Sequence, residues 1–429
     1  MKKQRKDMLV LGFALFSMFF GAGNVIFPPF LGMEAGPQWL SGFFCYYMAD
    51  IGLALVALFA MLHCNTDLDG ITKRIGKIPA VALSVAIILC IGPLLAIPRT
   101  AASTFEMSVL PIFSGFSPVL FSILFFALIF LLCMKESSVV DIVGKILTPA
   151  LFVGLLVLII KGIVDPLGAV SVTPKIANVP ASGILAGYQT MDVLAALVFG
   201  VLVLHTAEEK GYTSRSDKFK VVGGGGVVAG VGLLIVYAGL TYLGASVSGM
   251  YDSTINRSQL IIAIVESLLG RAGTILFGIV VALACITTAV ALVSSTAAYF
   301  ERLSNKKIRY TWLVAAMCGF SAVVSNFGLD QIVSLASPIL NIVYPAALTL
   351  IALSLVGKHI HNDNIFKFAT LGAFLTAVLE TLAAAGVPAV GLVAKLPLSA
   401  FGFGWVLPAV IFGLVGACIR APKTAEQAA

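Results

Sequence analysis

The chain contains long, nearly uninterrupted apolar runs, and these constrain its fold more than any other feature of the sequence. Runs of about 18 or more mostly apolar residues predict helices that cross a lipid bilayer. The runs do not alternate with a period of two residues, so a transmembrane β-barrel is excluded. About twelve spans are predicted by this length criterion, at residues 8–32, 38–62, 79–107, 117–134, 142–164, 184–206, 222–247, 272–300, 310–326, 332–355, 366–386 and 398–419.

The composition also favours lipid over water as the surrounding solvent. Hydrophobic residues make up 59% of the 429 residues, charged residues only 11%, and the mean hydropathy is +1.05. A soluble chain of this length needs more charge to cover its surface. The sequence therefore predicts an all-α integral membrane protein in which residues 1–429 form a single domain. Its first apolar run is predicted to remain as a helix and not to be cleaved as a signal peptide.

The distribution of Lys and Arg predicts the orientation in the membrane. The net charge of +7 does not indicate a nucleic-acid partner, because the basic residues are scattered in short loops. In a twelve-span topology most of the 27 Lys and Arg residues fall on one side, which is predicted to be cytoplasmic and to hold both termini. The opposite side receives only Lys161, Lys175, Arg257, Arg271 and Lys395.

The first span is interrupted by residues that weaken or end helices. It contains FFGAGNVIFPP at residues 19–29. Glycine weakens a helix and proline stops one, so an unwound stretch near the middle of the bilayer is predicted. Its backbone polar groups must then face protein, water, an ion or a substrate. Gly21 and Gly23 alone also fit a surface for close helix packing, but Asn24 and the proline pair favour the broken helix.

The sixth span begins with an unusually polar cluster, GYQTMD at residues 187–192. An ionisable residue inside a membrane marks a functional site by default, whereas Asp192 at a shallower depth would simply reach outside water. Span six is also the first of a second group of five. Broken helices at matching positions indicate two inverted repeats, 8–164 and 184–355, followed by two further spans in 366–419.

Broken half-helices offer two kinds of binding group. Free N–H groups at a helix N-terminus attract a carboxylate, and free carbonyls at a C-terminus coordinate a small cation. With apolar surroundings, this pair of features fits an apolar zwitterionic amino acid together with Na⁺ or H⁺. In span eight, Thr287 and Thr288 are candidate Na⁺ ligands because hard cations prefer oxygen. Alternatively, these hydroxyls bond their own backbone or a neighbouring helix.

Other ionisable residues within the spans need partners. Arg99 follows a proline in span three, and Glu106 lies seven residues further on, about two turns away on the same helix face. The two can pair with each other, or one of them can meet Asp192 or Asp50. A structural ion pair and a gate remain equal alternatives to a substrate contact.

Three further features have open alternatives. The outside segments 165–183 and 248–271 are expected to cross the surface, and the amphipathic part of the second is either a lid or a connector. Glycines 223–226 open span seven without the Lys of a phosphate loop, which predicts a hinge or a close packing site. Glu380 in span eleven is expected to face another helix of the protein.

These motifs resemble those of the bacterial branched-chain amino acid:cation symporters, the BrnQ-type carriers. The resemblance rests on residues 19–29, on residues 187–192 with the following Phe199 and Gly200, and on IPRT at residues 97–100. It covers nearly the whole chain, since the length, the predicted spans and the predicted location of the termini agree with the family. It implies the leucine-transporter fold, with five plus five inverted spans and two accessory spans.

The resemblance also implies a set of site residues. The substrate carboxylate would meet the N–H groups of Ala22 and Gly23. The residues implied to bind substrate are Ala22, Gly23, Asn24, Tyr188, Gln189, Thr190 and Met191. A Na⁺ site between spans one and eight would use the carbonyls of Ser17, Phe20 and Ala284 and the hydroxyls of Thr287 and Thr288. The candidates for a gate or a proton-linked group are Arg99, Glu106 and Asp192.

The leading hypothesis is a symporter in the cell membrane that imports leucine, isoleucine and valine with Na⁺, by alternating access around a mid-bilayer site. The alternatives are the same carrier driven by H⁺ and a nutrient sensor with the transporter fold. A channel would need a carbonyl filter or a charged ring, which the sequence lacks. No enzyme motif is present, and no cofactor beyond the coupling ion and no obligate protein partner is predicted.

Overall fold

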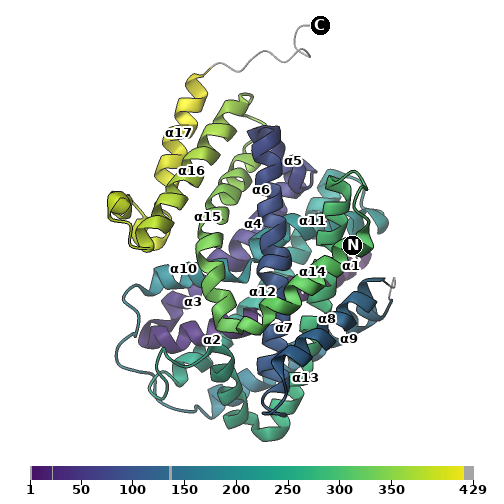
Figure 1. The fold of residues 1–429 in the computed structure, drawn as a ribbon, viewed down its shortest axis with the longest axis vertical. Coiled ribbons are helices and arrows are strands. Elements are labelled where there is room, and N and C mark those ends of the chain that lie inside the picture. Colours follow the sequence, from purple (N-terminus) through teal and green to yellow (C-terminus); the bar gives the residue numbers. More distant parts are fainter. Residues whose placement is uncertain (1, 22, 135–137, 420–429) are drawn as a thin grey trace.

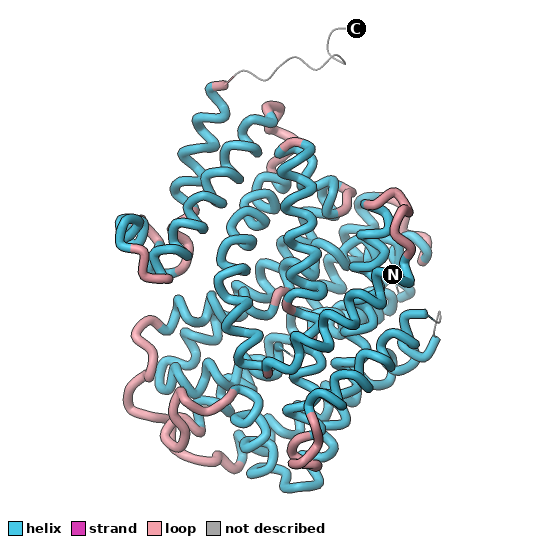
Figure 2. The backbone as a smooth tube through the Cα atoms, in the orientation of Figure 1, coloured by secondary structure: helices cyan, strands magenta, loops and turns pink. Residues whose placement is uncertain are grey.

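The computed structural model describes residues 2–21, 23–134 and 138–419. Within these ranges every regular element is helical and no strand occurs (Figures 1 and 2). The predicted all-α class is therefore confirmed.

The helices of the described residues follow one another in a single bundle (Figure 1). In chain order the α-helices are α1 (Lys2–Phe19), α2 (Gly23–Ala35), α3 (Trp39–Tyr47), α4 (Leu53–Cys64), α5 (Leu68–Thr72), α6 (Lys77–Leu89), α7 (Ala96–Thr104), α8 (Pro118–Met134), α9 (Ser138–Val164), α10 (Val179–Thr190), α11 (Asp192–Glu209), α12 (Arg215–Ser246), α13 (Arg257–Leu303), α14 (Tyr310–Val324), α15 (Leu329–Leu355), α16 (Asp363–Ala384) and α17 (Val406–Cys418). Short π-helices are η2 (Met48–Gly52), η4 (Cys90–Leu94) and η5 (Phe105–Val109). Short 3-10 helices are η1 (Gly36–Gln38), η3 (Lys73–Ile75), η6 (Ser325–Phe327), η7 (Pro388–Lys395) and η8 (Ser399–Phe401).

The predicted spans coincide with helices or with pairs of helices. Among the described residues, 8 helical segments are long and apolar enough to cross a membrane. One of them, Gly23–Cys64, has 42 residues and contains part of the first predicted span and the whole of the second. Shorter apolar helices occur at Pro118–Met134, Leu151–Val164 and Val406–Cys418. The chain is thus a multi-pass membrane protein, while the number of twelve crossings stays a prediction.

The first span is interrupted earlier than its prolines suggested. Helix α1 ends at Phe19 and α2 begins at Gly23. Pro28 and Pro29 lie inside α2, so the prediction that they extend the unwound stretch is wrong. Since proline has no N–H, they leave the carbonyls of Asn24 and Val25 without their helical donors. The N-terminal half of α2 therefore carries free polar groups without leaving the helix.

The sixth span is interrupted by one residue. Helix α10 continues to Thr190, and α11 begins at Asp192. Between them Met191 has φ 68° and ψ 14°, the left-handed conformation. A residue other than glycine adopts this backbone conformation at a cost in energy, so the surrounding structure must hold Met191 in it.

A third interruption, which the sequence analysis did not predict, lies between α6 and α7. Gly92 has φ −100° and ψ −134° inside η4, and Pro93 follows it. The chain then bends into α7, whose residues from Ala96 to Thr104 are all buried. This bend carries Arg99 into the interior of the bundle.

The glycine run 223–226 lies at a close contact between helices, which was one of its two predicted roles. It lies within the continuous helix α12. A β-carbon at Gly224 would lie 1.8 Å from Cε of Met8, the end of a flexible side chain, and one at Gly225 would lie 3.2 Å from the backbone nitrogen of Gly12. Glycine at 225 therefore lets the backbone of α1 approach α12 closely.

Helices α16 and α17 pack against each other at one side of the bundle (Figure 1). Residues 388–405 connect them and contain the short 3-10 helices η7 and η8. Helix α15 joins this pair to the rest of the bundle. The predicted boundaries of two repeats and two further spans remain a prediction.

Candidate functional site

The two interrupted spans meet inside the bundle. Asn24, at the start of α2, donates from Nδ2 to Oδ2 of Asp192, the first residue of α11, at 2.8 Å. The same amide group bonds the hydroxyl of Tyr237 from α12. None of the three residues is more than 6% exposed, so these bonds are shielded from water. One asparagine therefore links both interruptions to α12.

Arg99 supplies the positive charge of this junction. Its Nη1 donates to the carbonyl of Gln189 at 2.5 Å, and its Nη2 donates to the carbonyl of Thr190 at 3.2 Å. Carbonyls at a helix C-terminus lack intrahelical donors and carry partial negative charge, which stabilises a cation beside them. The guanidinium also lies 5.8 Å from the ring centroid of Phe27 in α2. Arg99 thus contacts both interrupted spans.

A second carboxyl group, that of Asp50, completes the charged cluster. Asp50 lies in the π-helix η2, is fully buried, and accepts a hydrogen bond from Oγ1 of Thr190 at 2.8 Å. Its carboxyl group also contacts that of Asp192. Its Oδ2 has no hydrogen-bond partner among the described residues. The sequence analysis named Asp50 only as an optional partner, although an ionisable residue within a span was the signal that it is part of the site.

The cluster combines two carboxyl groups with one guanidinium in a buried place. Two carboxylates in contact repel each other, and burial opposes the charge of both. Arg99 balances one negative charge. The arrangement therefore brings two acidic groups and one basic group together beside the open helix ends.

Four of the residues implied to bind substrate lie at this junction: Gly23, Asn24, Thr190 and Met191. A β-carbon at Gly23 would lie 3.0 Å from Nη2 of Arg99, so the first turn of α2 directly faces the guanidinium. Ala22 lies outside the described residues.

Tyr188 and Gln189 face cavities on either side of α10. The ring of Tyr188 stacks on that of Tyr344 from α15, with centroids 4.3 Å apart. Tyr188 lines a cavity of about 760 Å³ toward α16. Gln189 and Phe27 line a second cavity, of about 310 Å³, between α2, α10 and α15. Leu185 and Ser337 line both cavities, so the two spaces adjoin each other beside α10.

The predicted Na⁺ ligands lie on two elements. Ser17 is in the last turn of α1 and Phe20 follows that helix, whereas Ala284, Thr287 and Thr288 are half-buried in α13. Oγ1 of Thr287 donates to the carbonyl of Ala284 at 2.9 Å, which is the local backbone bond that was the alternative. The ligand set stays a prediction.

Glu106 and Arg99 do not pair. Glu106 accepts a hydrogen bond from the backbone N–H of Leu329 at 2.8 Å, and it also bonds the hydroxyl of Ser258. Glu106 therefore ties η5 to the first turns of α13 and α15 and not to the central cluster.

The amphipathic segment predicted as a lid or a connector is the first part of α13, before a bend at Gly270. Nη1 of Arg257 lies 2.5 Å from Oδ1 of Asp330 at the start of α15, and its guanidinium lies 4.4 Å from the ring centroid of Phe30 in α2. Both charged residues line the 310 Å³ cavity. This ion pair therefore closes one side of the space that leads to Gln189.

A polar link also joins the far ends of the two interrupted spans. Asp7 of α1 accepts hydrogen bonds from the hydroxyl of Tyr212 at 2.8 Å and from Nζ of Lys210 at 3.1 Å. These two bonds hold the pKa of Asp7 below its ordinary value. The link ties the start of α1 to the segment that follows α11.

Comparison with known proteins identifies the family. The family model described as branched-chain amino acid transport protein matches residues 4–423. The chain belongs to this family. Among curated members, the branched-chain amino acid permease BraB of Bacillus subtilis is 35% identical over 422 residues, which cover 96% of this chain and 95% of the relative. The branched-chain amino acid transport system 2 carrier protein of Pseudomonas aeruginosa is 37% identical over 417 residues, 94% of each chain.

The fold of this member of the branched-chain amino acid transport protein family is also found in solved structures. Mhp1, a nucleobase-cation-symport-1 family transporter in a closed conformation with bromovinylhydantoin bound, aligns with a TM-score of 0.65 and 13% identity. The alignment covers 96% of this chain and 92% of Mhp1. The leucine-transporter fold expected from the motifs is thereby confirmed. Because its relatives are named as permeases and carriers, this family member is a transport protein and not an enzyme.

Proposed function

We propose that the protein is a secondary active symporter that imports leucine, isoleucine and valine, coupled to Na⁺. The observation that carries this proposal is the meeting of two interrupted spans at one buried junction, joined by the bond from Asn24 to Asp192. Interrupted helices at matching positions are typical of transporter sites. The names of the curated relatives support branched-chain amino acids as the substrate class.

The substrate carboxylate would bind at the first turn of α2, near Gly23. A helix N-terminus offers free N–H groups and a positive partial charge. Arg99 lies beside the same turn, so its charge adds to this attraction. The nearby apolar side chains of Phe27 and Met191 suit an aliphatic group and offer no partner for a charged one.

Cavities on both sides of the junction are consistent with alternating access. The cavity of about 310 Å³ reaches Gln189, before the Met191 interruption. Another cavity, of about 560 Å³, lies among α6, α11 and α13 and is lined by Leu197 and His205, after the interruption. The two spaces therefore lie on opposite sides of the break in one span. We propose that the second space faces the cytoplasm with both termini, because the Lys-rich and Arg-rich loops lie on that side.

Na⁺ is proposed to bind between α1 and α13. The ligands would be the carbonyls of Ser17, Phe20 and Ala284 and the hydroxyls of Thr287 and Thr288. Carbonyl and hydroxyl oxygens suit a hard monovalent ion. Binding of Na⁺ at the end of α1 would then stabilise the first interruption in its substrate-binding arrangement.

Coupling to H⁺ is the second candidate, and one observation favours it. Asp50 and Asp192 are both buried and their carboxyl groups are in contact, which favours a shared proton. A proton released from this pair would leave two negative charges beside one arginine. The net charge of the junction would then differ between the state that carries the proton and the state that has released it.

The decisive experiment measures uptake of labelled leucine by proteoliposomes that hold the purified protein, with Na⁺ and pH gradients imposed separately. Accumulation driven by Na⁺ at equal pH, lost in Thr288→Ala and kept in Thr254→Ala, supports the Na⁺ site. Thr254 is the matched control because its hydroxyl is exposed and lies outside the spans. Accumulation driven only by the pH gradient, and lost in Asp50→Asn, overturns the Na⁺ assignment. Absence of accumulation under either gradient overturns leucine import.

A further inference from the structure

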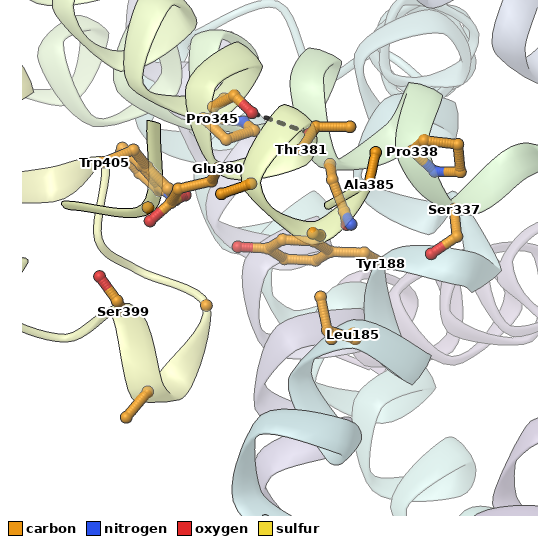
Figure 3. Close-up of a pocket in the computed structure, with 17 residues that line it drawn as sticks. Leu185, Tyr188, Ser337, Pro338, Pro345, Glu380, Thr381, Ala385, Ser399 and Trp405 are labelled. Atoms are coloured by element: carbon orange, nitrogen blue, oxygen red, sulfur yellow. Dashed lines mark hydrogen bonds between the residues drawn. The ribbon is translucent and has the colours of Figure 1, made fainter. Parts of the chain in front are cut away.

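The largest space described so far lies outside the central junction. The cavity of about 760 Å³ is lined by residues of α10, α15, α16 and the segment 388–405 (Figure 3). Tyr188, whose ring forms part of its wall, separates it from the junction together with the stacked Tyr344. The cavity is therefore a second space, in contact with the central site through only one layer of side chains.

Two buried hydrogen-bond donors in the cavity have no partner among the described residues. They are the hydroxyl of Tyr188, a residue 2% exposed, and the indole Nε1 of Trp405, a residue 8% exposed. The two groups lie near each other without the geometry of a hydrogen bond. Leaving a buried polar group without a partner is unfavourable, so such a pair calls for an acceptor supplied from outside the chain.

The same end of the cavity carries one carboxyl group. Glu380 projects from the apolar helix α16 beside Trp405, and Ser399 lies opposite (Figure 3). No Lys, Arg or His is among the residues that line the cavity. Glu380 is half-buried in a helix that is apolar enough to cross a membrane. An ionisable residue at such a place marks a functional site, and this one lacks a cation.

The backbone nearby leaves room for this carboxyl group. A β-carbon at Gly404 would lie 2.0 Å from Oε1 of Glu380 and 2.5 Å from Oγ of Ser399. Glycine at 404 therefore allows the carboxylate to sit at the wall of the cavity. The rest of the wall includes Leu185, Pro338 and Pro345, which offer apolar surface.

We propose that this cavity is a second binding site, for an apolar zwitterionic amino acid. The ligand's ammonium group would pair with Glu380. Its carboxylate would accept hydrogen bonds from Tyr188 and Trp405, and its aliphatic group would lie against Leu185 and Pro338. Charge-assisted bonds to the two charged groups of the ligand explain why a carboxylate without a cation and two unpartnered donors occur together.

Occupancy of this site would act on transport through α10. Tyr188 lies three residues before Met191, and its ring is held between the cavity and Tyr344. A ligand bonded to the Tyr188 hydroxyl would fix the end of α10 next to the interruption. The second site is therefore regulatory, and it rests on the proposed function only for the choice of leucine as its ligand.

The fluorescence of Trp405 tests the proposal directly. The chain has 3 tryptophans, so Trp39→Phe with Trp312→Phe leaves Trp405 as the only reporter. Titration of this purified variant with leucine is expected to give a saturable change. Adding Glu380→Gln is expected to raise the midpoint at least about tenfold, because one charged hydrogen bond contributes about 1.5–3 kcal/mol. Adding Gly404→Ala, which keeps the carboxylate but displaces it, is expected to act in the same direction.

Two analogues test the chemistry of the ligand. 4-Methylpentanoate lacks the ammonium group and isoamylamine lacks the carboxylate. Each is expected to bind at least about tenfold more weakly than leucine, since each loses one charge-assisted bond. Equal responses to all three compounds overturn the amino-acid site and indicate a pocket for any amphiphile.

Controls separate this site from the central one. Gly23→Ala, at the junction, is expected to impair uptake and to leave the Trp405 titration unchanged, whereas Asp165→Asn, an exposed carboxylate, is expected to change neither. A Trp405 response without any leucine uptake supports the second site and counts against the proposed import. Uptake without a saturable Trp405 response, or a response that Glu380→Gln leaves unchanged, overturns the second site. Loss of both uptake and response overturns both proposals.

Discussion

The two interrupted spans are broken in different ways. The first is broken around glycines, with α1 ending at Phe19 and α2 beginning at Gly23. The second is broken at one non-glycine residue, Met191, held at φ 68°. Glycine adopts unusual backbone conformations at little cost, whereas a left-handed residue with a side chain costs about 1–2 kcal/mol. The second break must therefore be held in place by its neighbours.

Those neighbours are already visible in the hydrogen bonds. The carbonyls of Gln189 and Thr190, at the end of α10, are bonded to Arg99. At the second break, the carbonyls are therefore already bonded to the guanidinium of Arg99. At the first break, the first turn of α2 offers the free N–H groups of a helix N-terminus. This difference indicates that the N–H groups at the first break are free to bind a ligand's carboxylate, whereas the carbonyls at the second break are held by the protein itself.

Removal of Arg99 should have the largest effect. Arg99→Ala leaves two buried carbonyls without their donor, and each lost hydrogen bond from a charged group costs about 1.5–3 kcal/mol. Leucine uptake into proteoliposomes should fall by more than about a hundredfold, and the thermal unfolding temperature should fall with it. Arg5→Ala, at an exposed arginine of α1, is the control and should change neither. Normal uptake by Arg99→Ala would show that the second break does not need its cation.

A glycine pair tests the first break. A β-carbon at Gly23 would lie 3.0 Å from Nη2 of Arg99 and 3.3 Å from Cε2 of Phe27, whereas one at Gly21 would meet only Oδ1 of Asn24 at 3.9 Å. Overpacking costs about 1–3 kcal/mol, so Gly23→Ala should reduce leucine uptake about tenfold. Gly21→Ala should change it by less than about threefold. Equal effects of the two substitutions would contradict an open site at the start of α2.

The sequence predicted both breaks as regions but not their exact residues. Glycines and prolines at residues 19–29 indicated an unwound stretch, yet Pro28 and Pro29 are helical because α2 is buried along its length and packing holds it. Met191 carries no local signal at all, since tertiary contacts impose its conformation. The bend at Gly92 has a local signal, because a Gly-Pro pair is typical of a turn or a break in a helix.

The partners of the buried charges depended on long-range folding. Asp192 and Arg99 were identified as site candidates because ionisable residues are rare inside spans. Their partners lie far away in sequence: Asn24 is 168 residues from Asp192, and Thr190 is 91 residues from Arg99. No spacing rule within a helix gives such pairs. The buried charges are therefore predictable from the sequence, whereas their hydrogen-bond partners depend on the tertiary fold.

Substitution of Met191 sharpens the comparison further. Met191→Gly removes the strain of the left-handed conformation but also deletes a side chain that is only 2% exposed, and loss of a buried Met side chain costs about 2–5 kcal/mol, so the free energy of unfolding should fall. Met191→Ala loses nearly the same packing and keeps the strain, so it should be less stable than the glycine variant by about 1 kcal/mol. Thermal unfolding of the two purified variants measures the difference. An alanine variant that is at least as stable as the glycine variant would show that backbone strain does not control the second break.

The smallest effect on leucine uptake is expected from substitution of Asp7, which links the start of α1 to the segment after α11. Asp7 of α1 bonds Lys210 and Tyr212 beyond α11, and these bonds hold its pKa below the ordinary value. A lowered pKa means that the link is complete above the ordinary Asp range and is lost only as the pH falls through the lowered value. Uptake near neutral pH should therefore show no pH dependence from Asp7. Asp7→Asn keeps one acceptor and removes a single, partly buried ion pair far from the junction, so the initial uptake rate should fall by less than about threefold. A loss as large as that of Arg99→Ala would show that the two breaks are coupled through their ends and not through the junction.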